Sequence, residues 1–215
     1  QLTYNPYMAA RIGLGTVELE PKLTADPLQI VENLEPVTGT THIKFMRTQR
    51  FVTGMPVAYH LGSAPFYRIL GDNDDDTLAL ARAMVSSLAY NHGPAELALM
   101  LVCADPDGPD WAPMKWLPHT LRAATGSTHK GRNIFRTMEE FMAATEALRL
   151  DRGPAVVGLG ANRSATTPRV VVIIDAPDDI FTLPAGLTAS GIAGLPVLIV
   201  RAESLGRALT IGPPE

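Results

Sequence analysis

The sequence predicts a three-layer α/β fold with a mostly parallel, five-stranded sheet and an N-terminal β-rich arm. Short runs of Val, Ile and Leu recur in the later part of the chain, and helical or loop-forming segments separate them. These runs are apolar on both strand faces, which is typical of strands that helices cover on each side. Residues 1–60 lack this order and contain several prolines. We therefore expect an arm or side lobe over residues 1–60 and an α/β domain over residues 61–215.

The arm is predicted to contain two strands and a helix. The segment RIGLGTVEL, which begins at Arg11, alternates apolar residues with small ones and predicts the first strand. A short helix is expected over Thr41–Val52. The β-prone segment PVAYHL, which begins at Pro56, predicts the second strand.

The α/β domain is predicted from a regular succession of elements. Its first helix begins among Asn and Asp residues, which cap helices, and it carries Leu80, Met84 and Leu88 as core positions. The expected elements, in chain order, are strand Phe66–Leu70, helix Asp74–Tyr90, strand Leu97–Cys103, helix Ile134–Leu148, strand Val170–Ile174, strand Val197–Val200 and a last β segment at Leu209–Ile211.

The composition excludes several classes of protein. Hydrophobic residues make up 46% of the chain and charged residues 19%, which argues against disorder and against a coiled coil. The longest apolar runs fall far below the ~20 residues that cross a bilayer. A net charge of −4 argues against a nucleic-acid-binding surface. The single cysteine, Cys103, lies in an apolar run and indicates a buried thiol in a reducing compartment, so a cytoplasmic location is expected.

The turn GDNDDDT, from Gly71 to Thr77, has the position of a phosphate-binding loop but not its residues. A P-loop, G-x-x-x-x-G-K-[ST], combines glycines, a lysine and a hydroxyl that holds Mg²⁺. Starting the pattern at Gly71 places Asp76 at the second glycine and Thr77 at the lysine. Shifting it so that Thr77 supplies the hydroxyl places Asp75 and Asp76 at the second glycine and the lysine. Neither alignment provides the second glycine or the lysine of a P-loop.

Two interpretations of this acidic turn remain open. Like charges 4 Å apart repel by about 1 kcal/mol in water and by about 4 kcal/mol near a protein surface, so the carboxylates disfavour a triphosphate. Carboxylates in the first turn of a helix also interact favourably with the helix dipole, by about 0.3–1 kcal/mol each, which explains them without a ligand. The alternative is a bound divalent cation. Its candidate ligands are Asp72, Asp74, Asp75 and Asp76, with help from Asp105, Asp107 and Asp110 after the next strand.

The segment RVVVIIDAPDD is similar to a Walker B strand, in which a terminal Asp organises Mg²⁺. That Asp is Asp175. Additional-strand P-loop ATPases usually place a water-activating Glu at the next position, where this chain has Ala176. The base needed for hydrolysis is therefore missing, and no catalytic residue is predicted.

Other chemical motifs are absent from the sequence. It contains neither a G-x-S-x-G elbow nor a C-x-x-C pair, and its histidines lack metal-site spacing, so no metal site is predicted from them. We expect the histidines at the surface or hydrogen-bonded in the core: His42, His60, His92, His119 and His129. Trp111 and Trp116 are expected to pack against the core.

A long co-linear series of segments resembles EccC, the membrane-anchored FtsK/SpoIIIE-type ATPase of type VII secretion systems. The series includes RIGLGTVEL at Arg11, GMPVAYHL at Gly54, the acidic DPD followed by MKWLPH at Met114, and VVVIIDAPDD at Val170. It covers nearly the whole chain and is similar to the first cytoplasmic module of that family, often described as a domain of unknown function.

This resemblance implies a RecA-like, P-loop-NTPase-like fold in which Phe66–Leu70 is the P-loop strand and Val170–Ile174 the Walker B strand. It also implies that the module is degenerate, so that only Gly71, Thr77 and Asp175 remain of a nucleotide site, with Asp76 in the same turn. No cofactor is then expected, although ATP and Mg²⁺ stay possible ligands.

The resemblance further implies transmembrane helices before Gln1, which is not an initiator Met, and further ATPase domains after Glu215. The implied partners are those ATPase domains and the membrane components of the secretion complex, in a hexameric assembly at the cytoplasmic face of the membrane. No nucleic-acid partner is implied, and the link to the membrane runs through the upstream helices alone.

Three functional hypotheses follow. The first is a non-hydrolysing ATPase-fold module that couples the membrane segment of the translocase to its ATPase domains. The second is residual Mg·ATP binding or hydrolysis at the Asp175 pocket. The third is a regulatory cation site at Asp72–Asp76.

Overall fold

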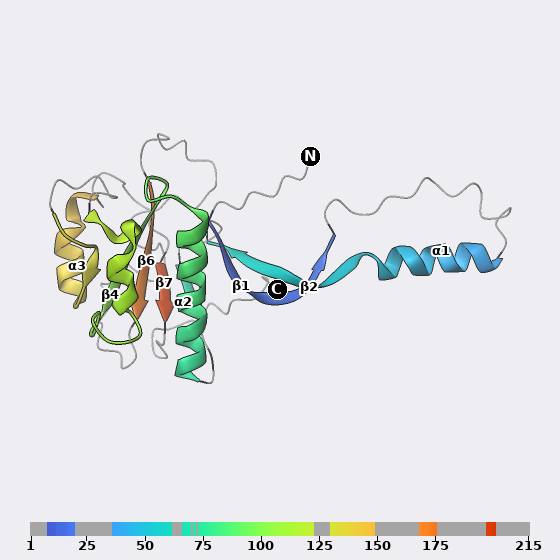
Figure 1. Cartoon of the computed structure of the whole chain (residues 1–215), viewed down its shortest axis with the longest axis horizontal. Coiled ribbons are helices and arrows are strands. Elements are labelled where there is room, and N and C mark those ends of the chain that lie inside the picture. The colour runs from blue at the N-terminus through green and yellow to red at the C-terminus, as the bar shows by residue number, and fades with distance from the viewer. Residues whose placement is uncertain are drawn as a thin grey trace.

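The computed structural model of the chain describes residues 8–19, 36–61, 66–69, 71, 73–122, 130–148, 168–175 and 197–200. Within these residues the molecule has two parts, an α/β body and an arm that projects from it (Figure 1). The arm consists of strand β1 (Ala9–Glu18), helix α1 (Pro36–Thr48) and strand β2 (Phe51–His60). The body contains the remaining elements.

The body is built on a parallel sheet with the strand order β3-β7-β6-β4-β5, counted over the described residues. Its strands are β3 (Phe66–Ile69), β4 (Leu97–Cys103), β5 (Ile134–Phe135), β6 (Arg169–Asp175) and β7 (Val197–Val200). Every pairing in this sheet is parallel. The predicted α/β class is therefore confirmed. The strand β7, the last of the described strands in the sequence, lies between β3 and β6.

Helical segments cover both faces of the sheet and give three layers (Figure 1). The long helix α2 (Asp74–Asn91) packs on one face with the short 3₁₀ helices η2 (Ala112–Trp116) and η3 (Pro118–Thr120). The helix α3 (Met138–Ala144) packs on the other face. Alternate residues of β4 serve the two cores: Leu97, Leu99 and Leu101 face α2, and Ala98, Met100 and Val102 face α3. All residues of β4 are buried, as its unbroken apolar sequence predicts.

The sequence of α2 explains its bounds. Asn73 caps the helix, because its side chain accepts a hydrogen bond from the backbone N–H of Asp75 at 2.8 Å. Leu78, Ala81, Val85 and Leu88 recur at intervals of three and four residues and form a buried stripe. The helix ends where His92 takes an extended conformation.

The arm is an antiparallel pair of long strands that ends in α1. β1 and β2 pair from Ala9↔His60 to Glu18↔Phe51, with two irregularities that bend the ribbon. Gly54 adopts a φ of 72°, a conformation that disfavours other residues. The arm exposes large apolar side chains along its length: Leu14, Val17, Ile43, Phe45, Phe51 and Met55.

The predicted helix in the arm was displaced. The expectation was Thr41–Val52, whereas α1 begins at Pro36 and ends at Thr48. Proline suits the first turn of a helix because its missing N–H would have no partner there. Phe51 and Val52 belong instead to β2, where they pair with Glu18 and Val17.

The predicted helix Ile134–Leu148 was wrong at its start. Ile134 and Phe135 form β5, which pairs with Leu101 and Val102 of β4. The helix α3 starts after Thr137, whose side chain accepts a hydrogen bond from the N–H of Glu140 at 3.2 Å. Within the described residues, β5 is thus the fifth strand of the parallel sheet. The predicted β segment Leu209–Ile211 lies outside the described residues.

Two positions of α2 provide a test of this packing. Leu88 is fully buried and Tyr90 is 90% exposed. We expect Leu88→Ala to lower the free energy of unfolding by about 2–5 kcal/mol, because it leaves a cavity in the core. Tyr90→Ala should change it by less than about 0.5 kcal/mol. Urea unfolding followed by circular dichroism measures both, and similar costs for the two variants would contradict the packing described.

Candidate functional site

The predicted site residues belong to segments at the carboxyl edge of the parallel sheet. In open parallel sheets ligands bind in the crevice outside this edge. β3 and β6 both end there, with β7 between them. The register places Asp175, the last residue of β6, beside Cys103 of β4 and Val200 of β7.

The acidic turn after β3 is used to start α2. Asn73 receives the N–H groups of Asp75 on its side chain and of Thr77 on its backbone carbonyl, at 2.8 and 3.1 Å. Asp74, Asp75 and Asp76 form the exposed first turn of the helix. Carboxylates at this position interact favourably with the unpaired N–H groups of the helix start. The protein therefore supplies its own anions where a P-loop would bind phosphate.

Gly71 and Thr77 are brought together in this turn. A Cβ atom at Gly71 would lie only 2.6 Å from Oγ1 of Thr77, so the close approach requires glycine. The Thr77 side chain is buried, and its hydroxyl donates a hydrogen bond to the carbonyl of Asn73 at 2.9 Å. The hydroxyl that would serve Mg²⁺ in a P-loop closes the first turn of α2 here.

Asp175 lies at the end of β6 and is engaged by a tryptophan. Its carboxylate is 1% exposed, and its Oδ2 accepts a hydrogen bond from the indole Nε1–H of Trp111 at 2.6 Å. Trp111 is itself 2% exposed. A buried carboxylate requires such a donor, because leaving it unpaired costs several kcal/mol. Trp111 thus donates a hydrogen bond to the residue that would organise Mg²⁺ in a Walker B strand.

The segment after β4, residues 104–111, holds Trp111 in place through three aspartates. Asp105 accepts a hydrogen bond from the N–H of Gly108 at 3.1 Å and tightens the turn. Asp107 pairs with Arg136, at 2.7 Å, and with Lys115, at 3.9 Å. Asp110 pairs with Arg82 of α2 at 3.2 Å. These exposed ion pairs are individually weak, but together they fasten the segment at both ends.

The acids do not assemble into a metal site in the described part of the chain. No group of three or more His, Cys, Asp or Glu residues there has the geometry to hold an ion. Asp105, Asp107 and Asp110 are engaged in the bonds described above, away from any cluster with Asp74–Asp76. Asp72 lies outside the described residues, so the predicted cation site at Asp72–Asp76 stays a prediction.

The hydrogen bond from Trp111 to Asp175 was not predicted from the sequence. The burial of Trp111 was predicted, but no pattern in the sequence indicates a bond to a residue 64 positions later. The prediction for Trp116 was wrong, since its side chain is 77% exposed. η2 is a 3₁₀ helix, and along it Trp111 and Met114 point inward while Trp116 points outward.

The relatives of this chain include proteins of ESX secretion systems. No protein-family model matches the chain. The ESX-1 secretion system protein EccCa1 of Mycobacterium tuberculosis is 33% identical over 205 residues, which cover 89% of this chain and 25% of that protein. The ESX-5 secretion system protein EccC5 of the same organism is 32% identical over 176 residues, which cover 78% of this chain and 12% of that protein.

The chain is homologous to part of EccC. The resemblance stated from the sequence is thereby confirmed. A solved structure, the cytoplasmic domain of the type VII secretion ATPase EccC of Thermomonospora curvata, covers 69% of the chain with 13% identity and a TM-score of 0.47, and the match spans 17% of that structure. The chain spans a quarter or less of the length of these EccC relatives.

Within the described residues, no helix combines the length and the apolar character needed to cross a bilayer.

The two tryptophans provide a matched test of the site. Trp111→Phe keeps a ring but removes the N–H that Asp175 accepts, so we expect it to lower the free energy of unfolding by about 1–3 kcal/mol. Trp116→Phe changes an exposed ring and should cost less than about 0.5 kcal/mol. Urea unfolding measures both variants. A Trp111→Phe variant as stable as the parent would show that the indole N–H does not support Asp175.

Proposed function

We propose that this chain is a non-hydrolysing ATPase-fold module of a type VII secretion translocase. Homology to EccC supports the place in a secretion system. The non-hydrolysing character is supported above all by one observation, the burial of Asp175 together with its hydrogen bond to Trp111.

The groups at the carboxyl edge do not fit Mg·ATP. The turn Gly71–Thr77 contains no lysine to neutralise phosphate charge. The Thr77 hydroxyl is bonded to Asn73, and one Asp175 oxygen is bonded to Trp111. The three exposed aspartates of the first turn of α2 would repel a triphosphate. Each group that would bind phosphate or metal is missing, reversed in charge or engaged by the protein.

Hydrolysis would need a further group. In additional-strand P-loop ATPases a glutamate after the Walker B aspartate activates water, and this chain has Ala176 at that position. Alanine carries no acid or base, so this position offers no means of activating a water molecule.

In this proposal the chain acts through the surfaces that contact its partners. In this proposal residues 1–60 lead toward the membrane segment of the translocase, and residues 61–215 contact the further ATPase domains of the same protein. The projecting arm, with apolar side chains such as Phe45 and Phe51 exposed, supports a role in contacts beyond this chain. The partners proposed are membrane components of the secretion complex and neighbouring copies in a hexamer, at the cytoplasmic face of the membrane.

Calorimetric titration of the purified chain with Mg·ATP tests the central proposal. We expect no heat of binding, because the edge is acidic and Asp175 is covered. Asp175→Asn is the matched variant, since it keeps the shape of the side chain and removes the charge. Micromolar or tighter binding to the parent would overturn the proposal. If that heat also vanished in Asp175→Asn, the second hypothesis, a residual nucleotide site at Asp175, would replace it.

A melting experiment tests the cation hypothesis for the acidic turn. A cation that binds only the folded state must raise the melting temperature as its concentration rises above its Kd. We expect Mg²⁺ and Ca²⁺ at several millimolar to leave the melting temperature unchanged. A rise that disappears in a variant with Asp74, Asp75 and Asp76 changed to Asn would establish a cation site at this turn.

A further inference from the structure

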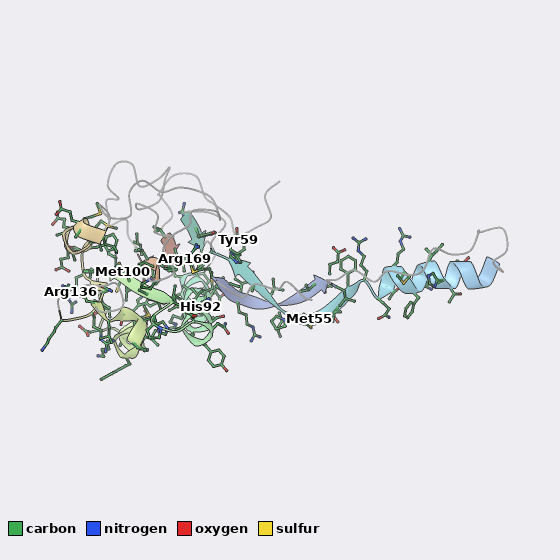
Figure 2. The ribbon with its side chains drawn as sticks, turned by 90° about the horizontal axis from the view of Figure 1, so that it is seen from above. Met55, Tyr59, His92, Met100, Arg136 and Arg169 are labelled. Atoms are coloured by element: carbon green, nitrogen blue, oxygen red, sulfur yellow. The ribbon has the colours of Figure 1, made fainter. Side chains whose placement is uncertain are left out.

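The far end of the arm exposes apolar side chains at a distance from the body. Ile43 and Phe45 of α1 are 56% and 57% exposed, and Phe51 at the start of β2 is 50% exposed. In Figure 2, Met55 lies between the body and α1, so α1 lies well beyond the sheet and its two cores. A helix of 13 residues without tertiary packing is only marginally stable in water. Contact with a partner would therefore stabilise this end of the arm.

The described part of α1 has an apolar side and a basic side. At 3.6 residues per turn, Ile43, Phe45 and Met46 fall within an arc of about 160° around the helix axis. Lys44 and Arg47 fall outside that arc, and both of their side chains are exposed. A helix with this distribution buries its apolar side in a partner and keeps its cations in water or beside negative charges.

The stretch of chain that includes α1 is positively charged. From Pro36 to Gly71 the sequence contains no Asp or Glu, although the whole chain has a net charge of −4. Arg50 is neutralised by Glu18, whose Oε1 accepts from its Nε–H at 2.6 Å. Lys44 and Arg47 form no ion pair in the part of the chain that the structure describes. The partner that fits this end of the arm is therefore apolar inside and negatively charged at its surface.

The spacing of the apolar side chains favours a lipid surface over a protein groove. A helix that binds in a groove presents anchors at i, i+3, i+4 and i+7, over about two turns. The described apolar side chains of α1, Ile43, Phe45 and Met46, lie within one turn. An interfacial helix needs no fixed spacing, only an apolar side for the acyl chains and cations for the headgroups. With a length of about 20 Å, α1 can lie on a bilayer but cannot cross its ~30 Å hydrocarbon core.

We propose that the end of the arm, α1 together with Phe51, docks on a membrane surface that contains anionic phospholipids. Its apolar side chains enter the boundary between headgroups and acyl chains, and Lys44 and Arg47 extend to the lipid phosphates. This contact rests on the proposed function in one respect, because a membrane must lie near residues 1–60. It also goes beyond that function, since the resemblance to EccC implied a link to the membrane through upstream helices alone.

Co-sedimentation of the 215-residue chain with phospholipid vesicles tests the contact. The probes are vesicles of phosphatidylcholine alone and vesicles of phosphatidylcholine mixed with phosphatidylglycerol. We expect binding to the anionic vesicles, weakened by salt, and little binding to the neutral ones, because the cations of α1 are attracted to anionic headgroups. Failure to bind the anionic vesicles, or equal binding to both kinds, would overturn the proposal. An acidic protein surface would then be the better partner for α1.

Two double variants with the same change of charge test whether α1 makes the contact. Each cation near an anionic surface strengthens binding about fivefold, so Lys44→Gln with Arg47→Gln should weaken binding to anionic vesicles roughly 30-fold. The control is Arg11→Gln with Lys130→Gln, which removes two exposed cations outside α1 and should bind like the parent. Equal binding by the two double variants would contradict a contact through α1.

An aromatic pair separates insertion of side chains from attraction between charges. Phe45→Ala should weaken binding to anionic vesicles roughly tenfold or more, because the ring leaves water on docking. Tyr90→Ala removes an exposed ring from α2 and should leave binding unchanged. Far-UV circular dichroism checks that both variants fold. If Phe45→Ala bound as tightly as the parent, the apolar part of the proposal would be wrong. The calorimetric titration with Mg·ATP reports separately on the nucleotide site, so the two proposals can fail independently.

Discussion

A hydrogen bond between Trp111 and Asp175 lies at the carboxyl edge of the sheet, where α/β proteins bind ligands. A carboxylate buried at a strand end must be paired, and the Trp111 indole supplies a neutral donor at 2.6 Å. To reach Asp175, the segment after β4 must turn back over the sheet, and the bonds of Asp105, Asp107 and Asp110 hold it there.

The strands of the body could be predicted because burial on both faces leaves a strong signal in short sequences. β4 and β7 have the predicted bounds, and β6 extends one residue further at each end. β5 was missed because two residues are too short for any periodicity, and its strand character comes from pairing with Leu101 and Val102. In the arm, propensity identified a helix and two strands, but the boundary between α1 and β2 depends on pairing with β1.

From the sequence, we could predict only which residues of a nucleotide site the candidate site lacks. A missing lysine, a missing glutamate and added aspartates are residue identities, and each has a direct physical consequence for phosphate or water. Hydrogen bonds between residues far apart in the chain, such as Trp111 with Asp175 and Met8 with His92, could not be predicted. No local pattern indicates such pairs. Trp111 and Trp116 lie in one short segment with similar surroundings in the sequence, yet the turn of a 3₁₀ helix buries the first and exposes the second.

The position of β7 in the sheet has a consequence for how the chain folds. β3 is made early, but its neighbour in the sheet is β7, which the ribosome produces after every other described strand. Until then β3 and the apolar stripe of α2 have no complete sheet to pack against. Contacts between such distant segments slow folding and prolong the exposure of apolar surface. β4 and β6, which share the longest pairing of the sheet, are both synthesised before β7, so they are available as a template on which the last strand joins β3 to the body.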